Sequence, residues 1–344
     1  NEVFHQVVTD PAGEAGNANT KPADAPVSYP CLWDTPQHDR VQWNGVAKNA
    51  GLGSLGRNVG EVLGVFGDFE VPERPGVTGY ASSVRVLNLA SIEESLKTLW
   101  SPQWPSTFPP IDPTKRDKGR LVYDKARCKD CHEVIDRKDP GRRITAMMVA
   151  VGTEARTMDN FQTRTGDAGR LKGAYQDVIP WPPLSPKVIG ATIQGEDLLA
   201  HTVIGTIIRS GFPAPEDELT KLEYKRRAQA MLTMVPVPPQ GGVYKARPLN
   251  GVWATAPYLH NGSVASLFQL LLAAKDRLKS FSVGTRQFDP VNVGFQTAAA
   301  GFPVFQARSA NGTPVPGNSN EGHEFGKELT DEERWQLVEY LKSL

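Results

Sequence analysis

The chain has 344 residues, of which 39% are hydrophobic and 22% are charged, as is typical of one large or two modest globular domains. Its 38 Lys and Arg residues balance its 38 Asp and Glu residues, and a net charge of zero argues against nucleic acid or an anionic membrane surface as a partner. Three cysteines exclude a disulfide scaffold and a four-thiolate metal site, and no run reaches the roughly 18 apolar residues that a membrane span needs.

The first part of the chain predicts little regular structure. Residues 1–36 are rich in Ala, Pro, Gly and Asn without periodicity, so we expect an extended segment. Because the first residue is Asn1 rather than Met, we expect a signal peptide or a longer segment to precede it. Apolar residues at helical spacing predict a short helix over 59–66, and an amphipathic helix over 88–100 follows, with Ser91 as its N-cap.

A proline-rich stretch over 101–110 indicates a stiff linker, at which we place a domain boundary. Residues 1–110 are then an extended segment and a partial upstream domain that packs toward a missing amino-terminal haem domain, and residues 111–344 form the main domain. The main domain opens with a helix to about residue 127, because Asp112 is a suitable N-cap and Pro113 suits the first turn.

The last helix is the best signalled, because Thr330 and Glu333 have the spacing of a capping box ahead of an apolar face. We see no convincing set of strands and no internal repeat. The expected fold is therefore mainly α, with long loops and helical insertions, and residues 140–195 are expected to be rich in loops. Further helices are expected over 196–210, 216–232 and 263–275.

The motif that carries chemistry is C-x-x-C-H at Cys128, Cys131 and His132. Two thiols at this spacing can add to the two vinyl groups of a haem, and the next residue can place its imidazole on the iron. The motif therefore predicts a covalently attached haem c. A zinc half-site would need further thiolates or imidazoles close by, and a thioredoxin-type pair would need a βαβ setting, which the sequence does not show.

The flanking helices resemble those of cytochrome c domains. In that family a glycine on the first helix lets the last helix cross it closely, with aromatic and apolar side chains around the crossing. Gly119 and Tyr123 match this pattern on one helix, and Leu337 and Tyr340 match it on the other. The resemblance thus implies a cytochrome c-type haem domain.

A second resemblance is more specific. Residues 247–263 are similar to the T-x-P-Y-x-H-x-G segment of bacterial di-haem cytochrome c peroxidases. Residues 42–45, 57–67 and 322–326 resemble most closely the oxygenase branch of that superfamily, which contains the haem-c rubber oxygenases and bacterial fatty-acid dioxygenases. The likeness runs from about Tyr29 onward.

One feature departs from that family, whose members carry two C-x-x-C-H motifs where this chain has one. By its order, the motif at 128–132 matches the second haem. We therefore expect a second haem c on an amino-terminal part that precedes this chain; the alternative is that the first haem has been lost. In the family the first haem meets O2 or peroxide, and the second shuttles electrons or tunes the first.

The ligand opposite His132 is open to several candidates. The resemblance to the oxygenase branch implies His323, which glycines 322 and 326 flank, whereas His260 resembles a group near the haem propionates. His201 lies in an apolar stretch, so we expect it to be a buried core residue. The remaining candidates are the methionines 147, 148, 158, 231 and 234.

Five other residues are candidates for the site. Arg57, Asn58 and Arg247 are expected to contact haem propionates or to line a shared active site. Phe66 is expected to line an apolar pocket at the first haem, with Glu61 as an acid or base there; the alternative for each is an ordinary core or solvated residue.

These observations predict the carboxy-terminal part of a di-haem oxygenase-like enzyme that cleaves or oxygenates an apolar unsaturated molecule or polymer with O2. One alternative is a cytochrome c peroxidase that reduces hydrogen peroxide and takes electrons from a donor protein. Another is a single-haem electron carrier. Because this cofactor is attached outside the cytoplasm, each alternative implies a periplasmic or secreted bacterial protein.

Overall fold

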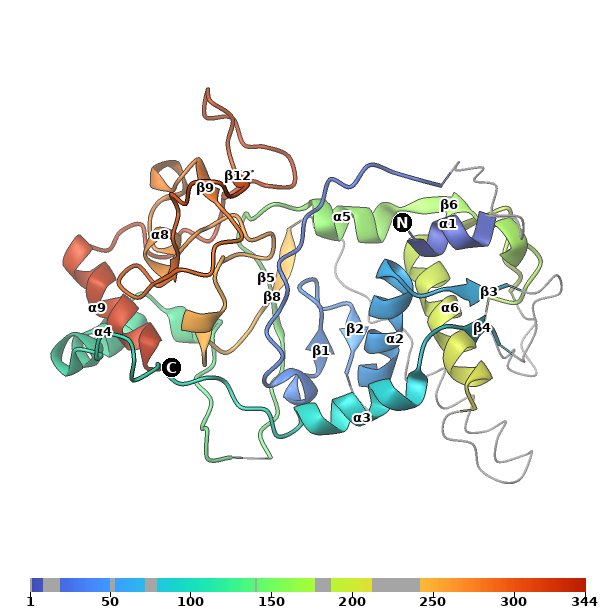
Figure 1. Cartoon of the computed structure of the whole chain (residues 1–344), viewed down its shortest axis with the longest axis horizontal. Helices are drawn as coiled ribbons and strands as arrows, with labels where there is room; N and C mark the ends of the chain where they lie inside the picture. The colour runs from blue at the N-terminus through green and yellow to red at the C-terminus, as the bar shows by residue number, and fades with distance from the viewer. Residues whose placement is uncertain are drawn as a thin grey trace. The chain divides into compact units, whose positions relative to one another are not determined.

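A computed structural model of the chain describes residues 2–8, 19–49, 53–71, 79–139, 141–176, 187–211 and 242–344. The chain forms two compact units (Figure 1), and each unit is assembled from three separate stretches of sequence. The first unit comprises residues 1–22, 38–98 and 160–237, and the second comprises residues 23–37, 99–159 and 238–344. The boundary expected at residue 110 divides the chain once, whereas the two observed units alternate along it.

The first unit is built around a helix pair. Residues Val59 and Leu63 of one helix and Leu198 and Ile207 of the other are buried in one apolar core, which explains the helical spacing of these side chains. Three two-stranded antiparallel sheets flank the helices. The elements are α1 (Glu2–Val8), β1 (Arg40–Val41), β2 (Ala47–Lys48), α2 (Gly53–Val65), β3 (Phe69–Glu70), β4 (Ala81–Ser82), α3 (Val86–Leu96), β6 (Thr165–Asp167), the 3-10 turn η3 (Gly169–Leu171), β7 (Thr192–Gln194) and α6 (Gly195–Arg209). Helix α5 (Arg156–Thr163) spans the point in the sequence, after Asp159, at which the chain passes from the second unit to the first.

The second unit combines two crossed helices with short sheets and irregular loops. Its sheets pair β5 with β8, β9 with β12 and β10 with β11, all antiparallel. The elements are the 3-10 turns η1 (Thr35–Gln37), η2 (Cys128–Asp130), η4 (Val252–Ala254) and η5 (Ala274–Asp276), the helices α4 (Pro113–Lys125), α8 (Leu267–Leu270) and α9 (Asp331–Lys342), and the strands β5 (Met147–Ala150), β8 (Val243–Ala246), β9 (Ser280–Ser282), β10 (Phe288–Asp289), β11 (Gly294–Phe295) and β12 (Val304–Gln306).

Helices α4 and α9 cross at Gly119, as the cytochrome c resemblance implies. A β-carbon added to Gly119 would lie 1.9 Å from the carbonyl oxygen of Gln336, so only glycine permits this approach. The rings of Tyr123 and Tyr340 meet edge to face beside the crossing, with centroids 5.3 Å apart. The crossing fixes the helix that leads into the C-x-x-C-H motif.

Both predicted N-caps in the second unit are confirmed. The carboxylate of Asp112 accepts hydrogen bonds from the backbone amides of Thr114 (2.9 Å) and Lys115 (3.0 Å). Thr330 and Glu333 form the capping box at the start of α9. These side chains satisfy amide groups that the first helical turn leaves unpaired.

Several expectations about secondary structure were wrong. Helix α3 begins at Val86, and Ser91 lies inside it, where its hydroxyl donates to the carbonyl of Leu87 instead of capping the helix. The described residues also form short strands that the sequence did not predict, so a mainly-α fold is not clearly confirmed. The helix expected over 216–232 lies outside the described residues. None of the described helices is long and apolar enough to cross a membrane.

The helix expected over 263–275 shrinks to the single turn α8, with Ser266 as its N-cap. A longer helix would need the amide of Ala274 to donate to the carbonyl of Leu270. Instead, the amide of Ala274 donates to the carboxylate of Glu324 (2.8 Å), and the carbonyl of Leu270 accepts from the side chain of Arg277 (3.3 Å). Long-range partners therefore end this helix.

Candidate haem site

The C-x-x-C-H motif occupies a tight turn directly after α4. Arg127 ends the helix in a left-handed conformation (φ 59°), and the amide of His132 then donates to the carbonyl of Cys128 (2.8 Å). The thiols of Cys128 and Cys131 are free and half-buried. Burial raises the pKa of Cys128 to about 11, so its thiol is protonated near neutral pH. The turn places both thiols and the imidazole on one short segment.

His132 is held by a backbone partner. Its Nδ1 lies 2.7 Å from the carbonyl oxygen of Arg247. Because a carbonyl can only accept, Nδ1 carries the proton and Nε2 is left as the lone-pair donor for a metal. The hydroxyl of Tyr123 also donates to the carbonyl of His132 (2.7 Å). The ring therefore has a fixed tautomer and orientation. In metal-binding histidines, the ring nitrogen that does not bind the metal usually makes such a hydrogen bond.

His323 faces His132 from a distant loop. Gly322 and His323 both have positive φ (75° and 50°), and the amide of His323 donates to the carbonyl of Val151 (2.9 Å). The two imidazole centroids lie 6.1 Å apart, with an angle of 54° between the rings. Desolvation, with smaller contributions from His132 and Arg277, lowers the pKa of His323 to about 3. Its imidazole is therefore neutral, which is the form that binds metals.

One small sheet supports both histidines. Strand β5 is followed by Val151, whose carbonyl accepts from the amide of His323, and strand β8 is followed by Arg247, whose carbonyl accepts from His132. The β5–β8 pairing thus connects the backbone contacts of the two rings.

The residues fit a haem c. Two imidazoles that bind one metal ion from opposite sides have centroids roughly 6 Å apart, because each nitrogen lies about 2 Å from the metal. The Nδ1 of His323 is buried and has no protein partner among the described residues. Within those residues no three His, Cys, Asp or Glu side chains form a group that would hold a bare metal ion. Cys128 and Cys131 would hold the porphyrin, and the imidazoles of His132 and His323 would bind its iron.

One comparison matches a segment that contacts this site through the carbonyl of Arg247. Residues 242–282 match a family described as RoxA-like, cytochrome c-like. The matched segment includes Arg247 and His260, but neither the C-x-x-C-H motif nor His323. This match agrees with the resemblance to the oxygenase branch of the di-haem peroxidase superfamily that the sequence shows. A cytochrome c-type domain of this kind belongs to an extracytoplasmic haem protein.

The chain is similar to two curated proteins from Sinorhizobium fredii. The uncharacterized protein y4iJ is 31% identical over 93% of the chain and 55% of its own length. The uncharacterized protein y4iM is 27% identical over 77% of the chain and 48% of its own length. The chain spans about half the length of these relatives. A MauG-like protein associated with microbial copper homeostasis aligns over 100% of this chain and 79% of its own, with 16% identity and a TM-score of 0.39.

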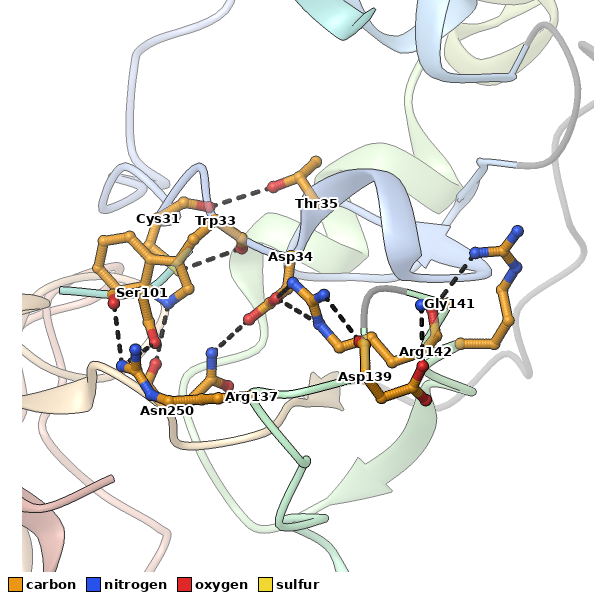
Figure 2. Close-up of polar contacts among 11 residues, drawn as sticks. Cys31, Trp33, Asp34, Thr35, Ser101, Arg137, Asp139, Gly141, Arg142 and Asn250 are labelled. Atoms are coloured by element: carbon orange, nitrogen blue, oxygen red, sulfur yellow. Dashed lines mark hydrogen bonds and ion pairs between the residues drawn. The ribbon is translucent and has the colours of Figure 1, made fainter. Parts of the chain in front are cut away.

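A network around a buried ion pair, which the sequence analysis missed, links the three stretches of the second unit (Figure 2). Asp34 pairs with Arg142 and also accepts a hydrogen bond from the side-chain amide Nδ2 of Asn250. The indole of Trp33 donates to the carbonyl of Asn250 (2.9 Å), and the guanidinium of Arg142 lies 3.7 Å from the ring centroid of Trp100. This network joins residues near 34 and 142 to a position three residues beyond Arg247.

The other ligand candidates have different surroundings. His260 is buried against Tyr244, with ring centroids 3.9 Å apart, and its Nε2 has no partner within the described residues. His201 is confirmed as a core histidine, because the hydroxyl of Tyr80 (2.8 Å) and the carbonyl of Tyr175 (2.9 Å) bond its two nitrogens. Among the methionines, 158 is fully buried, 147 and 148 lie in β5, and 231 and 234 lie outside the described residues.

Four of the remaining candidates, Arg57, Asn58, Glu61 and Phe66, belong to the first unit. The fifth, Arg247, contacts His132 in the second unit. Arg57 and Asn58 both bond the carboxylate of Glu93, which is 6% exposed and which the sequence analysis did not single out. Glu61 accepts from the side chain of Gln42 (2.6 Å), and Phe66 is 73% exposed, so it is not a core residue. The contact of Arg247 with His132 runs through its backbone.

Proposed function

We propose that this chain is the carboxy-terminal part of a di-haem oxygenase-like enzyme, and that its own haem c transfers electrons and tunes the partner haem. The observation that carries the proposal is the pair of neutral imidazoles, His132 and His323, facing each other with centroids 6.1 Å apart. A bound haem c supplies one-electron chemistry, and strong ligands on both faces favour electron transfer over O2 binding.

The side chains around the site act by orientation. The carbonyl of Arg247 keeps the proton of His132 on Nδ1, so Nε2 stays available as a ligand. The desolvated ring of His323 stays neutral over the physiological pH range. Neither imidazole needs to lose a proton before it binds iron.

We assign the reaction with O2 to a second haem c that lies outside this chain. The RoxA-like match supports this assignment, as does the fact that the chain spans about half the length of its curated relatives. The substrate class that we propose is an apolar unsaturated small molecule or polymer. We place the protein in the periplasm or outside the cell.

The proposal is tested on the full-length polypeptide, produced with a c-type haem maturation system. A pyridine haemochrome assay with intact mass should give two haems per full-length chain, one of them attached at Cys128 and Cys131. Oxygen uptake with polyisoprene or an unsaturated lipid should exceed turnover of hydrogen peroxide with reduced cytochrome c. Peroxide turnover without oxygen uptake would favour the peroxidase, and a single haem in a complete 37.5 kDa protein would favour an electron carrier.

A further inference from the structure

One buried arginine connects two loops of the second unit. Arg277 follows η5, is 3% exposed, and directs its guanidinium toward main-chain carbonyls only. Its five hydrogen bonds equal the five N–H donors of a guanidinium, so no donor is left for a carboxylate. The acceptors are the carbonyl oxygens of Leu270 (3.3 Å), Leu272 (3.2 Å), Asn320 (2.5 Å), Gly322 (2.9 Å) and His323 (3.1 Å).

Two of these bonds fix the peptide planes on either side of His323. The carbonyl of Gly322 belongs to the peptide that precedes His323, and the amide of that same peptide donates to Val151 (2.9 Å). The carbonyl of His323 belongs to the peptide that follows. Since the orientation of the two flanking planes defines φ and ψ, Arg277 and Val151 together determine the backbone of His323.

This constraint matters because His323 has a φ of 50°, in the left-handed region that is unfavourable for residues other than glycine. Such conformations persist when surrounding contacts determine them. The residue chemistry also points to arginine: a lysine ammonium has three donors and no planar fork, so it cannot bond five carbonyls in two loops.

We propose that Arg277 is a positioning residue for His323, whose guanidinium holds the loop at 320–323 so that the imidazole stays opposite His132. This inference rests on the proposed haem ligation by His132 and His323. The guanidinium of Arg277 forms no hydrogen bond with either imidazole ring, so it acts on His323 through the backbone.

The test uses the full chain loaded with haem and compares Arg277→Lys and Arg277→Ala with the parent. Cyanide binds only molecules in which His323 has left the iron, a minor state whose population sets the apparent affinity. Both variants should therefore show a high-spin component in the ferric spectrum and an apparent cyanide affinity that rises on the order of tenfold. Added imidazole should restore the low-spin spectrum. Because haem c in an unfolded chain would also bind imidazole, urea titration must show that the variants are folded.

Arg334→Lys is the matched control, because Arg334 also bonds main-chain carbonyls, of Leu271 and Lys327, but none in the loop at 320–323. It should keep the parent spectrum and cyanide affinity. If Arg277→Ala fails to fold, Arg277→Lys carries the test. The proposal is overturned if the Arg277 variants that fold retain the parent spectrum and affinity while His323→Ala loses the low-spin signal. If His323→Ala itself remains low-spin, the ligation by His323 is wrong, and the proposed haem ligation fails independently of Arg277.

Discussion

The Nδ1 atom of His132 lies 2.7 Å from the backbone carbonyl of Arg247, so the side chain of Arg247 takes no part in this contact. We therefore expect Arg247→Ala to keep the low-spin ferric spectrum and a full haem content, measured by visible absorption and pyridine haemochrome. His132→Ala is the control that should lose the low-spin spectrum. A loss of haem in Arg247→Ala would instead support the propionate contact suggested by the sequence.

The helix crossing at Gly119 predicts a large effect of one methyl group. In Gly119→Ala the new β-carbon would overlap the carbonyl of Gln336, and forced overpacking of this kind typically costs about 1–3 kcal/mol of unfolding free energy. The matched helical control is Gly64→Ala in α2, where the new atom meets nothing within 4 Å. It should stabilise its helix by about 0.5–1 kcal/mol. Urea unfolding of the two variants measures both effects, and equal shifts would contradict the close crossing.

The buried pair of Asp34 and Arg142 predicts that removing one charge is costly. Their side chains are 1% and 6% exposed, and removing one partner of such a pair typically costs about 3–5 kcal/mol because the other charge stays buried. We expect Asp34→Ala to lower the unfolding free energy by that order. Asp117→Ala removes the partner of Arg116 at the surface and should cost less than about 1 kcal/mol. Similar effects in the two variants would show that the buried pair does not matter to stability.

Stability should depend on pH through His260. Burial lowers its pKa from 6.5 to about 4 in the folded protein, so the unfolded chain takes up the proton first as the pH falls. This contribution is fully present above pH 6.5, is lost as the pH falls toward 4, and does not change below that. The total is on the order of 3 kcal/mol.

His260→Phe tests this, because it removes the titrating group and keeps an aromatic ring against Tyr244. The slope of unfolding free energy against pH should become shallower between pH 6.5 and 4, as measured by urea titrations at each pH. An unchanged slope would show that other groups account for the acid sensitivity.

Much of the haem domain is visible in the sequence because its signals are local or depend on residue type. The C-x-x-C-H motif, the Asp112 cap and the capping box at Thr330 each lie within a few residues, and Gly119 is required by one close contact. His323 was predicted as a ligand because glycines 322 and 326 flank it and because this segment resembles the oxygenase branch. The structure places it beside His132, and its ligation stays a prediction.

The contacts that the sequence did not predict mostly involve main-chain acceptors. Every residue has a carbonyl, so the type of the residue that accepts a bond from His132 or Arg277 is not constrained by that bond. Helix α8 ends early because Glu324, fifty residues away, takes the amide of Ala274. Four-residue strands such as β5 are too short for an alternating pattern to be recognised.

The alternation of the two units along the chain has a consequence for biosynthesis. Helix α4 packs against α9, and His132 bonds the carbonyl of Arg247, so the second unit cannot close until α9 has been synthesised. The turn that contains Cys128 and Cys131 is therefore synthesised well before Arg247 and α9, which pack around it in the folded unit. Maturation enzymes would meet these thiols on an open chain, and the porphyrin itself would then be present while the later segments fold around it.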